Sequence, residues 1–308
     1  MSTNVGFFCK SYRGDFIPLR QLLETFHAHN PEDLQLTLSL PDNDRVLFES
    51  AFSESRRNVR IVADESYCGE DLSRFPGWHA QQICKLMSWR VMEADHYAVL
   101  DSDCYLIRDI RRADLEPTLI YKNVACASYL RTVLKPENSN LVRYLRDELT
   151  IGPELFPAEP TDIVDRLSDF VHLKDLPQDN PGAVERSDVP MKTFGRKRWL
   201  YSQPGQIFSA ALLRDLLSFF GRHNLTAGDA ISISPWEYNW YGEFAATHAY
   251  RDTEFRISPF LHFQEKKDLE FARQQKFTEE TLQKKFWVIQ MAARHLAEPR
   301  FEDLLGAD

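Results

Sequence analysis

The first hundred residues alternate short apolar runs with amphipathic stretches, and this alternation constrains the fold more than any other feature of the sequence. The pattern predicts strands at Val5–Cys9, Leu34–Leu40, Val59–Ala63 and Tyr97–Leu100, and helices at Phe16–His29, Arg45–Phe52 and Gln81–Ala94. Strands that alternate with helices form mostly parallel sheets that are covered by helices on both faces. The sequence therefore predicts an α/β fold with a mixed, mostly parallel sheet flanked by helices.

The second half of the chain has a less regular pattern. Helices are predicted at Glu137–Leu149, Thr161–Phe170, Ala211–His223, Ser234–Glu243 and Thr278–Ala297, and strands at Gln206–Ser209 and Ile257–His262. Asp175–Arg198 is polar and contains several Pro and Gly residues, which predicts a long loop or a lid. Because no linker-like segment divides the 308 residues, we predict one catalytic domain over residues 1–263, with a helical extension over residues 264–308 packed on it.

Charge and composition exclude some classes of partner. The formal net charge of −9 argues against broad nucleic-acid binding, which needs a basic footprint. We expect no transmembrane segment, because no run of about 18 apolar residues is present. The N-terminal apolar run lacks the features of a signal peptide, and the five scattered cysteines favour reduced thiols. These observations predict a cytoplasmic protein, with a peripheral place at the inner membrane left open.

An apolar strand that runs directly into two carboxylates is the strongest functional signal. The predicted strand before Asp101-Ser102-Asp103 is short and apolar, and the two aspartates are one residue apart. Mg²⁺ and Mn²⁺ prefer such oxygen ligands and usually complete their shells with water and substrate phosphates. We therefore predict that Asp103 binds Mn²⁺ or Mg²⁺ directly, and that Asp101 either binds this cation through water or holds the ribose of a donor. The cation would neutralise charge on a diphosphate leaving group. The structural alternative is a solvated turn or a helix cap.

Polar residues follow each of the four N-terminal strands. Ligands bind beyond the carboxyl ends of the strands in sheets of this kind, so these residues should gather along one edge. Besides the two aspartates, they are Lys10, Ser11 and Tyr12 after the first strand, Asp42 after the second strand and Asp64 after the third strand. We predict that Tyr12 stacks on a nucleobase. Asp42 and Asp64 suit either a bond to the ribose or base, or a plain turn.

The order of these features resembles that of the GT-A glycosyltransferases. The segment Gly77–Leu86 is also similar to a bacterial glycosyltransferase-like family of unknown function (DUF6492), and the resemblance spans most of residues 5–263. It implies a Rossmann-like GT-A fold and a donor in which a sugar is linked to UDP or GDP. It also implies a glycan or other hydroxyl acceptor, inversion at the anomeric carbon, and a place in bacterial surface-glycan synthesis.

The same resemblance assigns roles to individual residues. Glu237 matches an acidic residue that acts as the base, although Trp-Glu-Tyr stands here where many members have a Glu-Asp pair. His262 matches a histidine that completes the metal shell, and Gly205 lies in a segment similar to a glycine loop that contacts the donor or acceptor. We also predict that further residues belong to the donor site, where Gln81 and Lys85 would meet the diphosphate or sugar: Trp78, Gln81, Gln82, Lys85 and Ser102.

Several of these residues have a structural alternative. Ser234 and Glu237 have the spacing of a capping box, with Ser234 as the N-cap. His248 competes with His262 as the metal ligand. Gln81 and Lys85 are four residues apart and so share a helix face, which also suits a solvated surface.

Two segments and the function as a whole also leave alternatives open. Gly195–Arg198 is cationic and suits either closure on donor phosphates or a solvated loop. The aromatic residues suit either a sugar-stacking wall or helix packing: Trp236, Tyr238, Trp240 and Tyr241. The alternative functions are a haloacid-dehalogenase-like phosphatase, in which the first aspartate of the motif is a nucleophile, and an inactive GT-A-like binding module.

Overall fold

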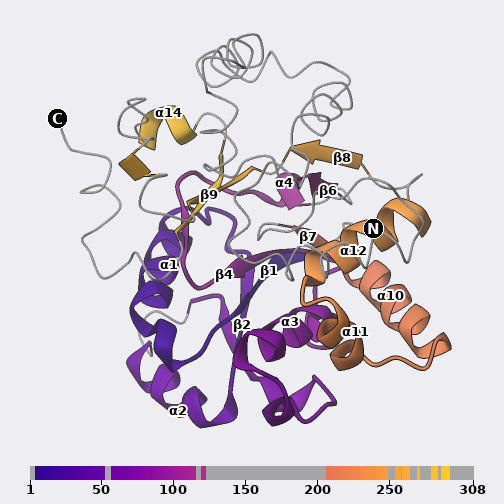
Figure 1. The fold of residues 1–308 in the computed structure, drawn as a ribbon. Helices are drawn as coiled ribbons and strands as arrows, with labels where there is room; N and C mark the ends of the chain where they lie inside the picture. Colours follow the sequence, from indigo (N-terminus) through magenta and orange to yellow (C-terminus); the bar gives the residue numbers. More distant parts are fainter. Residues whose placement is uncertain are drawn as a thin grey trace.

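A computed structural model of the chain describes residues 4–52, 57–115, 119–122, 206–248, 254–257, 259–263, 269–270, 279–283 and 286–291. Its largest sheet contains β1 (Val5–Lys10), β2 (Gln35–Leu40), β3 (Val59–Ala63), β4 (His96–Asp101) and β7 (Ile207–Ser209). The strand order is β3-β2-β1-β4-β7 (Figure 1). β1 to β4 run parallel, and β7 runs antiparallel to β4.

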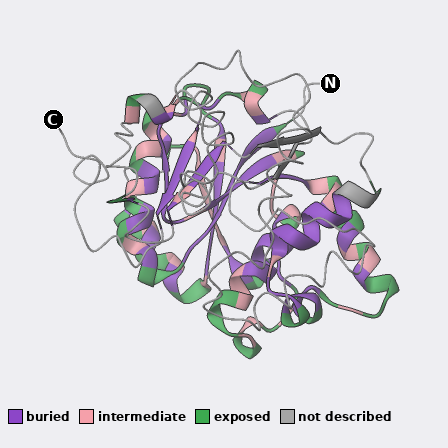
Figure 2. Ribbon diagram, turned by 45° about the horizontal axis from the view of Figure 1, so that its top comes forward, coloured by how far each residue is buried: buried purple, intermediate pink, exposed green. Residues whose placement is uncertain are grey.

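Helices cover both faces of this sheet. On one face lie α1 (Phe16–Ala28) and α2 (Asp42–Ala51), and on the other lie α3 (Gly77–Met87), α10 (Ala210–Arg222), α11 (Ala227–Ile233) and α12 (Glu237–His248) (Figure 1). Because successive side chains of a strand point to opposite faces, Phe7 belongs to the core under α1 and Phe8 to the core under α3. Figure 2 shows the strands buried and the outer sides of the helices exposed. The predicted α/β fold is confirmed.

A smaller sheet follows β4 in the chain. It contains β5 (Cys104–Leu106), β10 (Val288–Met291) and β9 (Phe260–Phe263) in the order β5-β10-β9. β10 runs antiparallel to β5 and parallel to β9. The remaining described elements are β6 (Leu119–Lys122) paired in parallel with β8 (Glu254–Ile257), α4 (Arg112–Leu115), α14 (Glu279–Gln283), and 3₁₀ turns at Arg13–Asp15, Asp64–Ser66, Leu72–Arg74 and Ser88–Arg90.

Two of the predicted helices begin earlier than expected, each directly after a proline. α2 begins at Asp42 rather than Arg45, and α3 begins at Gly77 rather than Gln81. Pro41 and Pro76 occupy the two N-cap positions with φ of −54° and −55°. Proline suits the start of a helix because its fixed φ is close to the helical value and its missing N–H is not needed there. α3 ends at Met87, where a 3₁₀ turn continues the chain, instead of reaching Ala94.

The predicted capping box at Ser234 and Glu237 is wrong. Ser234 ends α11, and its backbone N–H donates to the Ala230 carbonyl at 2.9 Å. The Trp236 carbonyl accepts the first backbone bonds of α12, so this helix begins at Glu237 and not at Ser234. Glu237 is therefore the first residue of its helix rather than the third, and its side chain needs another explanation.

Two further predictions near the C-terminus are wrong. Ile257–His262 is not one strand, because the chain leaves β8 at Ile257 and enters β9, in a different sheet, at Phe260. Thr278–Ala297 is not one helix, because among its described residues Glu279–Gln283 are helical and Val288–Met291 form a strand. The β-branched Val288 and Ile289 favour a strand where β5 and β9 offer partners on both sides. The extension over residues 264–308 is therefore not purely helical.

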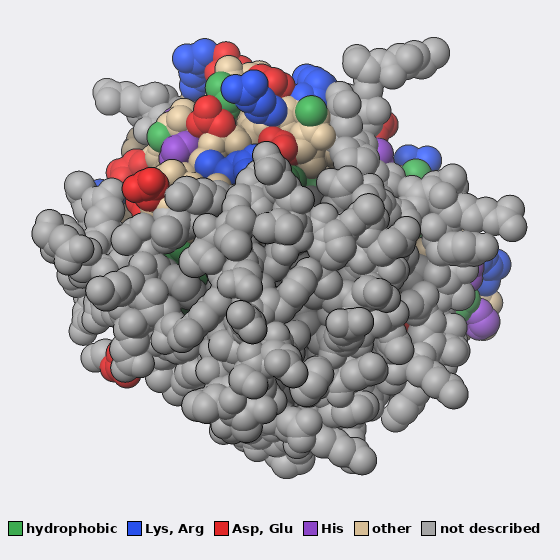
Figure 3. Space-filling view, turned by 90° about the horizontal axis from the view of Figure 1, so that it is seen from above, with side chains coloured by type: hydrophobic (Ala, Val, Ile, Leu, Met, Phe, Trp, Pro, Cys, Tyr) green, Lys and Arg blue, Asp and Glu red, His purple; other side chains and the backbone are tan. Residues whose placement is uncertain are grey.

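Other predictions lie outside the described residues. They are the helices Glu137–Leu149 and Thr161–Phe170, the segment Asp175–Arg198 with its cationic run, and Gly205. Within the described ranges, no helix is both long and apolar enough to cross a membrane. Figure 3 shows basic and acidic side chains side by side on the described part of one face, so charges of both signs are interspersed there.

Candidate active site

The strand order places a topological switch point between β1 and β4. The chain passes from β1 to β2 and β3 on one side of β1, and β4 then lies on the other side. In open α/β sheets, ligands bind beyond the carboxyl ends of the strands at such a point. Lys10 and Asp101 are the last residues of these two strands and are partners in their register. The topology alone therefore predicts a ligand site at these two residues.

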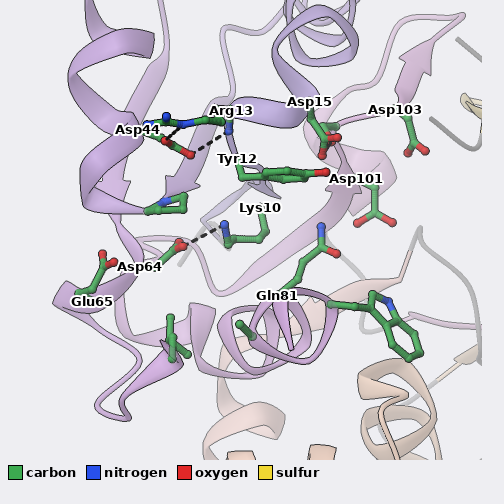
Figure 4. A pocket seen from close by; sticks show the side chains of 16 residues that line it. Lys10, Tyr12, Arg13, Asp15, Asp44, Asp64, Glu65, Gln81, Asp101 and Asp103 are labelled. Carbon is green, nitrogen blue, oxygen red and sulfur yellow. Dashed lines mark hydrogen bonds and ion pairs between the residues drawn. The ribbon is translucent and has the colours of Figure 1, made fainter. Parts of the chain in front are cut away.

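A cavity of about 760 Å³ opens at this edge of the sheet (Figure 4). Its volume lies within the usual range for small-molecule sites. The segments after β1, β2, β3 and β4 line it together with the first turn of α3, as the strand-end prediction requires. The predicted residues that line it are Lys10, Tyr12, Asp64, Trp78, Gln81, Asp101, Ser102 and Asp103.

Four predicted donor residues do not line this cavity. Ser11 is buried, and its backbone N–H donates to the Ser39 carbonyl at 3.0 Å. Gln82 and Lys85 are also buried, with 3% and 2% of their surfaces exposed. Asp42 is exposed in the first turn of α2, whereas Asp44, two residues later, lines the cavity.

The Asp101-Ser102-Asp103 segment is the turn that joins the two sheets. β4 ends at Asp101 and β5 begins one residue after Asp103. The Ser102 hydroxyl donates to Asp15 Oδ2 at 2.6 Å, which ties the turn to the segment after β1. From the other side, the Met291 N–H donates to the Asp103 carbonyl at 3.0 Å. The motif is thus fixed between β1 and β10.

The side chain of Gln290 joins the two aspartates. Its Nε2 donates to Asp101 Oδ2 at 3.1 Å and to Asp103 Oδ1 at 2.9 Å. Gln290 lies on β10, between Cys104 on β5 and His262 on β9 in the registers of the two strand pairs. The sequence analysis missed this residue, because it assigned Gln290 to a helix that is not there.

The electrostatics of the motif fit a divalent cation. Burial, and after it the neighbouring Asp101 carboxylate, raise the pKa of Asp103 to about 7. Asp101 Oδ2 and Asp103 Oδ1 lie close enough together to accept from the same NH₂ group. Carboxylate oxygens are hard ligands of the type that Mg²⁺ and Mn²⁺ prefer. In the described part of the chain, no three His, Cys, Asp or Glu side chains group so that they could hold a metal ion. Among these described residues, a cation held by the two aspartates would need a ligand of another type or one from a substrate.

A buried lysine pairs with two carboxylates behind the motif. Lys85 Nζ lies 2.7 Å from Asp101 Oδ1 and 3.1 Å from Glu237 Oε1, and 5.0 Å from the centre of the Tyr238 ring. Burial acts to lower the pKa of Lys85, but the Asp101 and Glu237 carboxylates outweigh it and raise that pKa well above its usual value. Burial raises the pKa of Glu237, and Lys85 opposes this shift. The three side chains connect β4, α3 and α12.

The opposite end of the cavity has its own buried polar group. Lys10 Nζ lies 2.9 Å from Asp64 Oδ2, and the Ser39 hydroxyl donates to Asp64 Oδ1 at 2.5 Å (Figure 4). Burial raises the pKa of Asp64, and Lys10 opposes the shift. Asp64 is only 3% exposed, so it is a fixed polar group at the wall of the cavity and not part of a solvated turn.

An exposed tyrosine ring lies between these two groups. Tyr12 is 49% exposed and lines the cavity, and Figure 4 shows its ring between Lys10 and Asp15. Its position depends on Gly14, because a methyl group added there would lie 2.3 Å from Tyr12 Cε2. Next to it, the backbone N–H and Nε of Arg13 donate to Asp44 at 2.8 and 2.6 Å. Arg13, Asp15 and Asp44 were missed, although all three lie within three residues of predicted site residues.

Three of the four aromatic residues of the predicted stacking wall lie in the core, and the fourth lies near the cavity. Tyr238, Trp240 and Tyr241 are buried in the core under α3, as the packing alternative expected. Trp236 instead packs against Trp78, with ring centres 5.2 Å apart, and Trp78 is 46% exposed at the cavity. Of the predicted stacking wall, Trp236 thus contacts a cavity residue, Trp78, which was predicted separately as a donor-site residue.

The two histidine candidates lie in different places. His262 is the register partner of Gln290 and therefore shares its face of the small sheet. His248 lies at the end of α12, where its ring stacks on Phe244 with centres 4.3 Å apart. The structure thus places His262 beside the side chain that contacts the motif. Its role as a ligand remains a prediction.

The chain is similar to one protein family and to several solved structures. Residues 9–137 match the model of a family of unknown function (DUF6492), and no curated protein matches the chain. Solved structures with a similar fold are the WbbM bifunctional glycosyltransferase, the galactosyltransferase LgtC with donor and acceptor sugar analogues, and mouse xyloside xylosyltransferase 1. Their sequence identities are 12%, 10% and 10%, and each TM-score is 0.44.

The coverage differs among these structures. The match to WbbM covers 94% of this chain but 46% of that protein, so the chain spans about half of its length. The match to LgtC covers 97% of this chain and 90% of LgtC. The match to the xylosyltransferase covers 94% of this chain and 98% of that protein. Similarity at this level leaves the function to be argued from the site itself.

Proposed function

We propose that this chain is a GT-A-type glycosyltransferase that moves a sugar from a nucleotide-sugar donor to an acceptor hydroxyl. One observation carries the proposal: paired carboxylates stand at the switch point of a parallel sheet, at the edge of a cavity with an exposed aromatic ring. Such a site offers a metal position for a diphosphate and a stacking surface for a base in one cavity.

Asp101 and Asp103 would hold Mn²⁺ or Mg²⁺ in this reaction. The cation would neutralise the charge that develops on the nucleoside diphosphate as it leaves. Lys85 holds the Asp101 carboxylate in place through its contact with Oδ1, while Oδ2 faces Gln290. Ser102 holds the turn against Asp15. These contacts set the positions of the two carboxylates before any substrate binds.

The nucleotide would lie across the ends of β1 and β3. Tyr12 offers its exposed ring to the base, and Lys10 with Asp64 offers a charged edge to the base or ribose. The exposed Trp78, packed on Trp236, would face the transferred sugar or the acceptor. We propose a UDP- or GDP-linked donor and a glycan or other hydroxyl acceptor.

Glu237 remains our proposed base, and inversion our proposed stereochemical course. Its carboxylate is separated from Asp101 by one lysine and has a pKa raised by burial, which suits proton acceptance. It is also 2% exposed and paired with Lys85, so the acceptor hydroxyl would have to reach it as the site fills. A product with retained anomeric configuration, observed by NMR, would remove this assignment.

A thermal-shift screen tests the proposal. We expect one class of nucleoside diphosphate, with Mn²⁺ present, to raise the melting temperature of the wild type. A ligand at 100 times its dissociation constant adds about 2.7 kcal/mol to the free energy of unfolding. The same nucleotide in EDTA is the control and should give a smaller shift. No shift with any nucleotide would contradict the proposal, and phosphate release from a generic phosphoester would favour the phosphatase alternative.

Nucleotide affinity should depend on where the Tyr12 ring lies. Tyr12→Ala is expected to weaken nucleotide binding roughly 5- to 150-fold, because base stacking on an aromatic ring is worth about 1–3 kcal/mol. Gly14→Ala should weaken it in the same direction without removing the ring, since its methyl group displaces Tyr12. Isothermal titration calorimetry with the nucleotide identified by the screen measures both.

Gly221→Ala is the matched control for the glycine variant. A methyl group there meets nothing within 4 Å, so nucleotide affinity should equal that of the wild type. If Gly14→Ala also binds like the wild type while Tyr12→Ala does not, the ring acts without a fixed position. If neither variant weakens binding, the base does not stack on Tyr12.

A further inference from the structure

Gln290 occupies the place where two carboxylates need a positive partner. The Asp101 side chain is 19% exposed, and Asp103 as a whole residue is 9% exposed. Each carboxylate turns one oxygen toward the NH₂ group of Gln290. An NH₂ group carries only partial positive charge. A divalent cation would meet the same two oxygens more strongly.

The other end of this amide lacks a partner. Gln290 is 6% exposed, and its Oε1 is buried without a hydrogen bond. An unpaired buried carbonyl oxygen costs free energy, and such groups in native structures usually have a specific use. The oxygen and nitrogen of an amide are nearly equal in size, so rotation about the last side-chain bond exchanges them within the same space.

With the amide of Gln290 turned over, its oxygen would face the two aspartates. With Oε1 in the place of Nε2, three oxygens from Asp101, Asp103 and Gln290 would face one another. That arrangement is repulsive alone, but it is the hard oxygen set that Mg²⁺ and Mn²⁺ bind. An amide can therefore serve as a donor when the cation is absent and as a ligand when it is present.

The backbone supports this use of Gln290. β10 is held on both sides, by β5 and by β9, and the next residue, Met291, donates its N–H to the Asp103 carbonyl. A side chain on such a strand keeps a fixed distance from the motif while its amide turns. Sites with ligands on strands are better fixed than sites on loops.

We propose that Gln290 is a protein ligand of the divalent cation held by Asp101 and Asp103, and that its amide turns from hydrogen-bond donation to oxygen coordination when the cation binds. The inference rests on the metal site of the proposed function and goes beyond it, because it assigns a third side chain from a different sheet. It also explains the buried, unpartnered Oε1.

Two substitutions of Gln290 distinguish a metal ligand from a brace, meaning a side chain that only holds the two aspartates by hydrogen bonds. Gln290→Met keeps the length of the side chain without its polar end, and Gln290→Glu keeps the shape but offers only oxygens. A ligand predicts opposite effects on the Mn²⁺ dissociation constant: weaker binding by at least roughly tenfold in Gln290→Met, and tighter binding in Gln290→Glu. A brace predicts weaker binding in both variants, because both lose the NH₂ donor.

The measurement is Mn²⁺ titration of the full chain followed by electron paramagnetic resonance of the free ion, with and without nucleoside diphosphate. Gln283→Met is the matched control, since the Gln283 amide donates to Glu279 on α14 away from the motif. It should bind Mn²⁺ like the wild type. A second readout is the side-chain NH₂ signal of Gln290 in NMR, identified by its loss in Gln290→Met, which should shift when diamagnetic Mg²⁺ is added.

Each outcome decides the inference. Opposite effects of the two variants together with a shifted NH₂ signal support it, and weaker binding in both variants or an unshifted signal overturns it. A wild type that binds no Mn²⁺ under either condition also overturns it. That last result leaves glycosyl transfer open, because nucleotide binding in EDTA in the thermal-shift screen tests the donor site separately.

Discussion

Lys85→Met is expected to lower the free energy of unfolding by about 3–5 kcal/mol, because removing one partner of a buried ion pair leaves uncompensated charge behind. Lys85 is 2% exposed and pairs with two carboxylates, Asp101 at 2.7 Å and Glu237 at 3.1 Å. Methionine keeps a similar length and an apolar chain, so the lost charge rather than a cavity dominates the effect. Urea denaturation of the wild type and the variant measures the difference.

Arg20→Met provides the matched control for this prediction. Arg20 pairs with Glu24 at 3.6 Å on the surface of α1, with both side chains at least 60% exposed. Exposed pairs of this kind contribute roughly 0–1 kcal/mol. Adding Glu237→Gln to Lys85→Met should recover part of the loss, since it removes one of the two orphaned carboxylates. If Lys85→Met lowers the free energy of unfolding no more than Arg20→Met does, the buried ion pairs of Lys85 with Asp101 and Glu237 do not stabilise the fold.

Asp103→Asn is expected to reduce metal-dependent turnover of the donor roughly a thousandfold. A metal ion at a leaving diphosphate contributes several kcal/mol, and each 1.36 kcal/mol is tenfold in rate. The variant should unfold no more readily than the wild type, because burial of the Asp103 carboxylate, and after it the nearby Asp101 carboxylate, disfavour its charge and raise its pKa. Initial rates of nucleoside diphosphate release with saturating Mg²⁺ measure the effect.

Asp215→Asn separates this effect from a general loss of negative charge. Asp215 is exposed on α10, outside the cavity, so its substitution should leave the rate unchanged. Equal rates for Asp103→Asn and the wild type would show that the turnover does not use the motif. A variant that loses turnover but also unfolds at lower urea would instead point to a structural role.

The residues at the strand ends could be predicted because their placement follows from local pattern alone. Apolar runs locate β1, β3 and β4, and parallel strands bring the residues after them to one edge. Lys10, Asp64 and Asp101 were found in this way, and all three line the cavity. The prediction failed for Asp42, because the helix after β2 begins directly after Pro41 and turns Asp44 inward instead.

Gln290 could not be found from the sequence. Its contacts with Asp101 and Asp103 span 189 and 187 residues, and nothing local indicates them. The strand that carries it has only four residues, and periodicity does not separate such a short apolar run from a buried helix. Pairing with β5 and β9 decides its conformation, and that information lies in distant parts of the chain.

The capping prediction failed for a related reason. Ser234 and Glu237 have the right spacing, but Ser234 is already the end of α11. The described capping box lies at the other end of that helix, between Thr226 and Asp229. With the capping role removed, the burial of Glu237 is explained by its ion pair with Lys85, which no local pattern predicts because Lys85 is on α3.

The most direct test of the central claim is proton NMR of the wild type with a panel of UDP- and GDP-linked sugars and Mg²⁺, with and without glycan acceptors. The account predicts that the anomeric signal of one donor disappears while its nucleoside diphosphate forms, faster with an acceptor and not in EDTA. Unchanged donor signals across the whole panel, with inorganic phosphate released from a simple phosphoester, would contradict glycosyl transfer.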